Sequence, residues 1–167
     1  MENNMSIKDA FIAFWMKGFT FTGRARRREV WLNILATIII GLILTIVVLL
    51  LEIMTGGRYH LMDHYGFVAG TIFPYITTIP TMAQASRRLH DINMSGKIAI
   101  VITVLSAILS FITEQMTGTF PVSLDTISLP IILITLFTVL GGLFLFIINF
   151  IKGNEGDNKY GKDPKRV

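Results

Sequence analysis

The chain has 167 residues, of which 52% are hydrophobic and only 16% are charged, and its mean hydropathy is +0.62. A soluble domain usually carries about 25% charged residues, so lipid is expected around much of this surface. The absence of cysteine excludes disulfides, zinc–thiolate sites and thiol catalysis. The length suits one domain, which we predict to be a single membrane domain over residues 1–167.

Residues 6–19 are predicted to form an amphipathic helix ahead of the first apolar segment. Ser6 and Asp9 have the spacing of a capping box, with Asp in place of the usual Glu. An apolar face repeats at helical spacing and comprises Ile7, Phe11, Phe14, Trp15 and Gly18. Such a helix lies in the headgroup plane of a bilayer or packs beneath a helical bundle, and the two arrangements are compatible.

Four apolar segments are predicted to cross the membrane, at about residues 30–51, 66–85, 98–113 and 127–151. The first has 22 uncharged residues, which at about 1.5 Å per residue cover roughly 33 Å, enough for a ~30 Å hydrocarbon core. The second is rich in threonine and contains Pro74 and Pro80, which a span tolerates when neighbouring groups satisfy the freed carbonyls. The sequence therefore predicts an all-α, polytopic membrane protein.

The last two segments differ in length. The third is short and is expected to gain a turn at one end, whereas the fourth is long enough to require a tilt or a bend. Pro130 falls in the first turn of the fourth segment, where proline costs little.

Lysine and arginine are distributed very unevenly between the segments. Fourteen of the 15 lie before the first, between the second and third, or after the fourth, and only Arg58 lies elsewhere. Because cytoplasmic loops carry this excess, both termini and the tail at 152–167 are predicted to be cytoplasmic. The basic pI of about 9.6 is then a topology signal, and no nucleic-acid partner is expected.

Three polar stretches fall on this predicted cytoplasmic side. The first, at 23–31, places arginines beside Trp31 and suits headgroup phosphates, or simply anchors the first span. The second lies at 86–97, and if the second span continues into it as a helix, Gln84 of the span shares one face with Arg87, Arg88 and Asp91. The third, at 152–164, predicts an ordered loop, since its glycines and Asn and Asp residues favour turns.

A fourth polar group, at the opposite side, comprises His60, Asp63 and His64. On a helix these residues have metal-ligand spacing, but residues at the membrane interface are the preferred interpretation. The tail misses the spacing of a calcium loop. We predict no metal site and no cofactor.

Together the three stretches resemble the YhaH/YhaI-like family of bacterial inner-membrane proteins, catalogued as domain of unknown function 805. The resemblance is carried by FTGRARRREVW at 21–31, by RLHD at 88–91 with Ser95 and Gly96, and by residues 153–164, which include NKYG at 158–161. Lys97 departs from the family pattern, which often has an aromatic residue there. The resemblance implies a location in the bacterial cytoplasmic (inner) membrane, and it brings no established activity.

The leading functional hypothesis is a non-enzymatic membrane protein whose cytoplasmic cluster binds anionic lipid headgroups or a protein partner. The residues expected to bind are Arg24, Arg27, Arg28, Arg87, Arg88, His90, Asp91, Asp157 and Asn158. A partner could be another membrane protein or a second copy of the chain. The same residues could instead only lock together the cytoplasmic ends of the helices.

Two other functions remain open. The threonine- and proline-rich second span could line a small transporter or channel, although none of the spans carries a central ionisable residue. A membrane-embedded enzyme could use His90 and Asp91 on a lipid-linked substrate. No catalytic residue is assigned.

Overall fold

The computed structural model describes residues 5–117 and 128–164, and it confirms an all-α fold. The helices are α1 (Ile7–Met16), α2 (Arg27–Met54), α3 (Leu61–Phe67), the π-helical η1 (Val68–Ile72), α4 (Phe73–Asp91), α5 (Lys97–Thr117) and α6 (Leu129–Ile147). The tail contains an isolated antiparallel bridge between Asn158 and Gly161.

Two of these helices, α2 and α6, are long and apolar enough to cross a bilayer, and Lys97–Thr113 is a shorter apolar helix. In α2 the buried residues are Glu29, Val30, Asn33 and Ala36, all within its first ten residues. Most of the remaining apolar side chains of α2 are exposed along one continuous rod. An apolar surface of this extent is expected to face lipid.

The predicted second span lies in a longer helical rod that runs through α3, η1 and α4. The π-helical η1 ends at Ile72, two residues before Pro74, and the Phe73 N–H donates to the Val68 carbonyl five residues back. Proline has no N–H to donate, and the wider hydrogen-bond spacing of a π-turn lets the helix continue past it. The rod continues to Asp91, so the predicted extension beyond residue 85 is confirmed.

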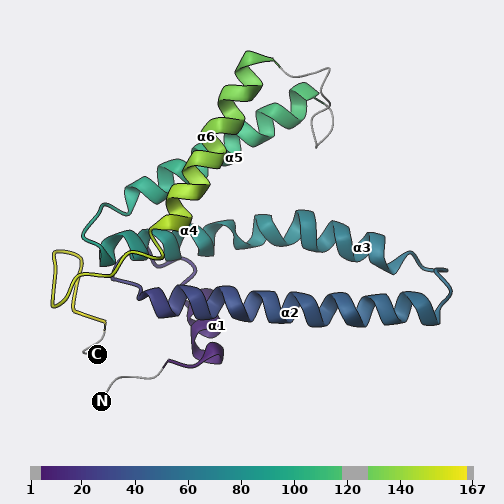
Figure 1. Cartoon of the computed structure of the whole chain (residues 1–167), viewed down its shortest axis with the longest axis horizontal. Coiled ribbons are helices and arrows are strands. Elements are labelled where there is room, and N and C mark those ends of the chain that lie inside the picture. Colours follow the sequence, from purple (N-terminus) through teal and green to yellow (C-terminus); the bar gives the residue numbers. More distant parts are fainter. Residues whose placement is uncertain (1–4, 118–127, 165–167) are drawn as a thin grey trace.

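The rods form two helical hairpins that meet at one end of the molecule (Figure 1). In one hairpin α2 lies antiparallel to α3–α4, and in the other α5 lies antiparallel to α6; the two diverge away from their junction. The start of α2, the end of α4, the start of α5, the end of α6 and the tail gather at this junction, here called the polar end.

The two later helices differ from their predicted bounds. Helix α5 extends to Thr117, which supplies the extra turn expected for the short third segment. Helix α6 starts at Leu129, with Pro130 in its first turn, and ends at Ile147, because the chain turns at residues 148–150. Position 127, the predicted start of this segment, lies outside the described residues.

Helix α1 crosses α2 and also contacts α4. Its capping box is confirmed, since the Asp9 N–H donates to Ser6 Oγ at 3.1 Å and the Ser6 N–H donates to Asp9 Oδ2 at 3.2 Å. The helix is shorter than residues 6–19. Its contact face is centred on Ala10 and Phe14, which are buried, and on Gly18, where a Cβ atom would lie 3.1 Å from Pro80.

Part of the predicted apolar face of α1 nevertheless remains exposed. Ile7 and Trp15 are more than a third exposed, as are Ile12 and Met16. The inner face packs beneath the bundle, and the outer apolar side chains suit a lipid headgroup region.

Candidate functional site

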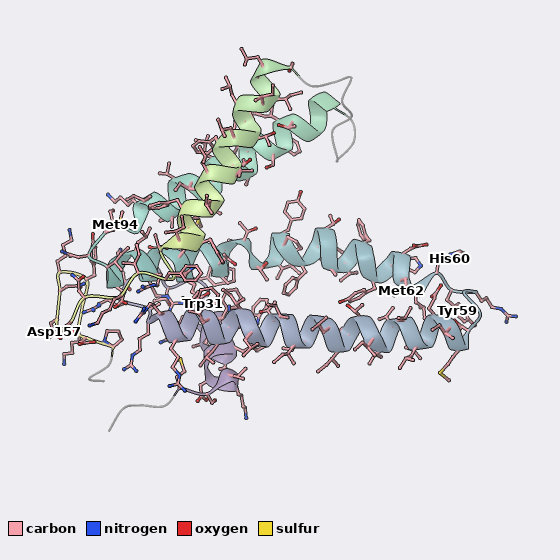
Figure 2. All side chains as sticks on the ribbon, in the orientation of Figure 1. Trp31, Tyr59, His60, Met62, Met94 and Asp157 are labelled. Atoms are coloured by element: carbon pink, nitrogen blue, oxygen red, sulfur yellow. The ribbon has the colours of Figure 1, made fainter. Side chains whose placement is uncertain are left out.

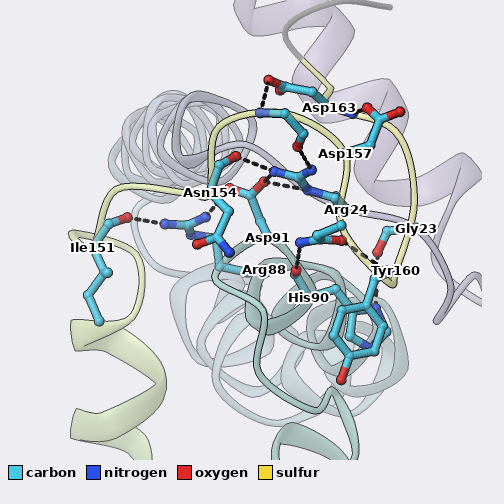
Figure 3. A network of polar contacts seen from close by, with 12 residues as sticks. Gly23, Arg24, Arg88, His90, Asp91, Ile151, Asn154, Asp157, Tyr160 and Asp163 are labelled. Atoms are coloured by element: carbon cyan, nitrogen blue, oxygen red, sulfur yellow. Dashed lines mark hydrogen bonds and ion pairs between the residues drawn. The ribbon is translucent and has the colours of Figure 1, made fainter.

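Asp91, the last residue of α4, lies at the centre of a buried polar network at the polar end (Figure 3). Its Oδ1 accepts from Arg24 Nε at 3.0 Å, and its Oδ2 accepts from Arg88 at 2.5 Å. All three side chains are at most 6% exposed. A carboxylate shared by two guanidinium groups offsets part of the cost of burying all three charges.

Arg24 links α4 to the tail after α6. Its two terminal nitrogens donate to the Gly156 carbonyl at 2.6 Å and to the Asn154 carbonyl at 2.5 Å. The backbone of Asn154 is held in turn, because its N–H donates to the Asp91 carbonyl at 2.8 Å. The planar guanidinium of arginine suits such a fan of acceptors, which the single ammonium of lysine would not satisfy.

Arg88 and Arg87 point to different partners. Arg88 also donates to the Ile151 carbonyl just after α6, and Arg87 pairs with Glu29 of α2 at 3.0 Å. Carbonyl oxygens beyond a helix end carry partial negative charge and are good acceptors for a cation. Burial lowers the pKa of Arg88, and the charge of Asp91 opposes that shift.

His90 is held by contacts to its ring and to its backbone carbonyl. Its Nδ1 lies 3.0 Å from the Gly23 carbonyl, and its ring stacks on Tyr160 with 3.9 Å between centroids. Asn158 donates to the His90 carbonyl at 2.9 Å. Burial lowers the pKa of His90 below its usual value; the Gly23 hydrogen bond opposes this shift and the charge of Lys159 adds to it.

The tail folds into an ordered loop, as predicted. The Asp163 N–H donates to Asp157 Oδ1 at 2.8 Å, and the Gly156 N–H donates to Asp163 Oδ2 at 3.0 Å. Asp157 therefore shapes the loop, and in the described part of the chain it forms no ion pair with Arg24, Arg87 or Arg88. Arg88 forms its ion pair with Asp91.

Two glycines are required by close packing at this end. A Cβ atom at Gly96 would overlap the Ser86 hydroxyl and approach His90, and one at Gly153 would overlap the Asp91 carboxylate. These contacts explain why glycine stands in the Ser95–Gly96 motif and at the start of the tail motif.

The structure brings together most of the predicted binding residues but uses many of their polar groups internally. Arg24, Arg87, Arg88 and Asp91 are buried, whereas Arg27, Arg28 and Asp157 are exposed. Arg27 donates to the Phe150 carbonyl at 3.2 Å. The three stretches are thus joined into one unit, here called the polar cluster: Arg24, Arg27, Glu29, Arg87, Arg88, His90, Asp91, Asn154, Asn158 and Tyr160.

Several hydrogen bonds at the polar end could not be predicted from the sequence, because their acceptors are backbone carbonyls. The acceptors at Asn149, Phe150 and Ile151 are main-chain carbonyls, which any residue supplies. The indole N–H of Trp31 donates to the Asn149 carbonyl at 3.1 Å.

A cavity of about 460 Å³ opens beside the polar cluster, between the N-terminal segment, the start of α2 and the tail. Its lining consists of Met5, Asp9, Lys17, Arg24, Arg26, Glu29, Lys162 and Pro164. Arg24 and Glu29 are already paired inside the cluster. Lys17, Arg26 and Lys162 form no ion pair within residues 5–117 and 128–164. We call this space the basic cavity.

The fourth predicted polar group lies at the opposite end of the molecule. Figure 2 shows Tyr59 and His60 there, far from Trp31 and Asp157 at the polar end. His60 and Asp63 lie 3.6 Å apart, and both side chains are more than 70% exposed. An exposed pair of this kind contributes little to stability.

The fold and the polar cluster define a small helical membrane protein whose chain segments are tied together at one end by buried arginine–carboxylate contacts. The chain belongs to the family described as "Protein of unknown function (DUF805)", whose model matches residues 18–162. The matched range contains all three polar stretches up to Lys162, so the resemblance noted in the sequence is confirmed.

Two curated relatives from Escherichia coli strain K12 are similar over most of the chain, and both are named inner membrane proteins. YhaI is 28% identical over 152 residues, covering 87% of this chain and 86% of its own length. YhaH is 26% identical over 145 residues, covering 87% of each. No solved structure matches the chain.

Proposed function

We propose that the protein crosses the bacterial inner membrane four times, with both termini in the cytoplasm, and binds anionic lipid headgroups without catalysing a reaction. The polar end then faces the cytoplasm, in accord with the excess of lysine and arginine there. The observation that carries the binding role is the basic cavity, where three cations that form no ion pair in the described part of the chain surround a space of about 460 Å³.

The polar cluster and the basic cavity have different roles in this proposal. The guanidinium groups of Arg24 and Arg88 already donate to Asp91 and to tail carbonyls, so they serve as a framework. Lys17, Arg26 and Lys162 remain available for phosphate oxygens, and Asp9 is engaged by Ser6. Charge-assisted hydrogen bonds to phosphate are among the stronger polar contacts in proteins.

The position of α1 also supports a lipid ligand. The exposed apolar residues Ile12, Trp15 and Met16 are on the same short helix as Asp9, which lines the basic cavity. A lipid can satisfy both features at once, with its phosphate in the cavity and its chains along the apolar side of α1. A soluble anion would use only the first feature.

The non-enzymatic assignment is supported by the state of the two residues considered for catalysis. His90 is held by the Gly23 carbonyl and by the Tyr160 ring, and both oxygens of Asp91 accept from arginine. A general acid or base has to reach the proton that it transfers. The channel alternative is not favoured either, because Thr77 and Thr78 donate to carbonyls of their own helix.

The test compares two triple variants with equal loss of charge. In the first, Lys17, Arg26 and Lys162 become Gln; in the second, Lys8, Lys97 and Lys152, which are exposed and do not line the basic cavity, become Gln. Retention of phosphatidylglycerol is measured by native mass spectrometry after purification in mild detergent. We expect at least a tenfold loss for the first triple and little change for the second.

If both triple variants lose phosphatidylglycerol equally, the binding is general electrostatic attraction. If the first triple variant retains phosphatidylglycerol, the proposed headgroup site is wrong. A co-purifying protein that is lost only from the first triple would replace the lipid with a protein partner.

A further inference from the structure

A second polar feature lies between α2 and α4, away from the polar cluster. Asn33 and Gln84 are each 5% exposed, and Asn33 Nδ2 donates to Gln84 Oε1 at 3.4 Å. The remaining polar atoms, Asn33 Oδ1 and Gln84 Nε2, are buried and have no hydrogen-bond partner in the described part of the chain. Leaving a buried polar group without a hydrogen bond is unfavourable, so two such atoms side by side call for a ligand or water.

The chemistry of the missing partner follows from the two amides. Turning both amide groups over exchanges the roles of their oxygen and nitrogen atoms, yet one N–H donor and one oxygen acceptor always remain. A single group that satisfies both atoms must donate one hydrogen bond and accept another, as a hydroxyl does. A carboxylate or a ketone only accepts, and an ammonium group only donates.

Both amides line a cavity of about 290 Å³, far larger than the ~10–15 Å³ that one water molecule needs. Its other walls are largely apolar or aromatic and include Trp15, Ile38 and Phe73. Among the described residues, its lining contains no Asp, Glu, Lys or Arg that could supply a counter-charge to a charged group. This lining favours a neutral ligand over a charged one.

A second cavity of about 310 Å³ adjoins the first and shares Thr37 and Phe73 with it. Most of its other lining residues are apolar, among them Phe11, Ile40, Leu44 and Val68. The two cavities run side by side along the groove between α2 and the rod of α3, η1 and α4. A molecule that places a hydroxyl group at the amides and an apolar chain along the groove has the chemistry of an uncharged lipid.

We propose that Asn33 and Gln84 bind the free hydroxyl of a neutral diacylglycerol-type lipid, with an acyl chain in the groove between α2 and α3–α4. This site does not depend on the basic cavity, because the two share no lining residue. A phosphate-bearing lipid would occupy the basic cavity, and an acylglycerol would occupy the amide site.

The structure supplies its own reporter for this site. Of the two tryptophans in the chain, Trp15 lines the first cavity, and Trp31→Phe leaves it as the single indole. Diacylglycerol with brominated acyl chains, added to the protein in detergent, is expected to quench Trp15 saturably. The 3-O-acetyl derivative of the same lipid cannot donate a hydrogen bond, and we expect roughly tenfold weaker binding for it.

The amides are tested in the same Trp31→Phe background. Asn33→Leu and Gln84→Leu are each expected to weaken quenching by the diacylglycerol about tenfold. Thr78→Val is the control, since Thr78 is on α4 and lines neither cavity. Circular dichroism melting confirms that each variant is folded.

Equal quenching by both lipids, or unchanged quenching in the leucine variants, would overturn the proposal and leave the cavity to water. Where a leucine variant fails to fold, the comparison of the two lipids on the unaltered amides still decides. Loss of phosphatidylglycerol retention in the Lys17, Arg26 and Lys162 variant does not bear on this outcome.

Discussion

Gly153 lies directly against the Asp91 carboxylate, and a Cβ atom at position 153 would overlap it. The tail after α6 can therefore approach the end of α4 only because residue 153 has no side chain. This approach lets Arg24 donate to Asp91 and to the Asn154 carbonyl at once. One glycine thus permits contacts between residues that are 67 and 130 positions apart in the chain.

Gly153→Ala is predicted to destabilise the protein. The added methyl group pushes Asp91 away from Arg24 and Arg88, and overpacking of this kind costs about 1–3 kcal/mol. The measurement is the midpoint of thermal unfolding in detergent. Gly142→Ala in α6 is the control, because its Cβ meets nothing within 4 Å and alanine favours the helix. Equal midpoints for the two variants would show that the tail does not need this close approach.

Asp91→Asn is predicted to lower the free energy of unfolding by about 3–5 kcal/mol, because it leaves the buried Arg24 and Arg88 without their shared carboxylate. Asp63→Asn removes a carboxylate that is 82% exposed and should leave stability nearly unchanged. Denaturant titration followed by tryptophan fluorescence measures both, since Trp31 belongs to the polar end. Similar stability of the two variants would contradict the role of Asp91 as the centre of the network.

Stability is predicted to fall as the pH drops below about 6.5, the ordinary pKa of histidine. Burial lowers the pKa of His90 in the folded protein, so the unfolded chain takes up the proton first and acid favours unfolding. The contribution is fully present above the unfolded pKa and is lost as the pH falls through the lowered, folded pKa. Melting midpoints between pH 7.5 and 5.5 record it.

The variant His90→Gln should flatten this dependence, since glutamine does not titrate. His60→Gln removes a histidine that is 74% exposed and should keep the dependence of the unaltered protein. A profile unchanged by His90→Gln would assign the effect to other groups.

The proposed four-span topology predicts which loops an external reagent reaches. The chain has no cysteine, so Ser95→Cys between α4 and α5 and Tyr59→Cys between α2 and α3 each introduce a single thiol. Both positions are exposed in the structure. In intact cells, a membrane-impermeant maleimide should label position 59 and leave position 95 unlabelled until the cells are opened. Labelling of position 95 in intact cells would contradict the proposed cytoplasmic location of the connection between α4 and α5.

The amino-acid sequence by itself determined the class of the fold and the side on which the polar residues gather. Long uncharged apolar runs can satisfy their backbone only as helices in lipid, which is why 30–51 and most of 127–151 could be recognised as helices. Two further features could be predicted because they depend on spacing within one helix: the capping box of Ser6 and Asp9, and the extension of α4 to Asp91.

Tertiary structure decided which residue pairs with which. The sequence placed Arg87, Arg88 and Asp91 on one helix face, and only the packing of α2 against α4 directs Arg87 to Glu29 and leaves Arg88 for Asp91. The tail carbonyls that accept from Arg24 carry no sequence signal, since every residue has one. The unsatisfied amides of Asn33 and Gln84 likewise emerge only when two helices meet, because a hydrogen bond depends on distances that the order of residues does not contain.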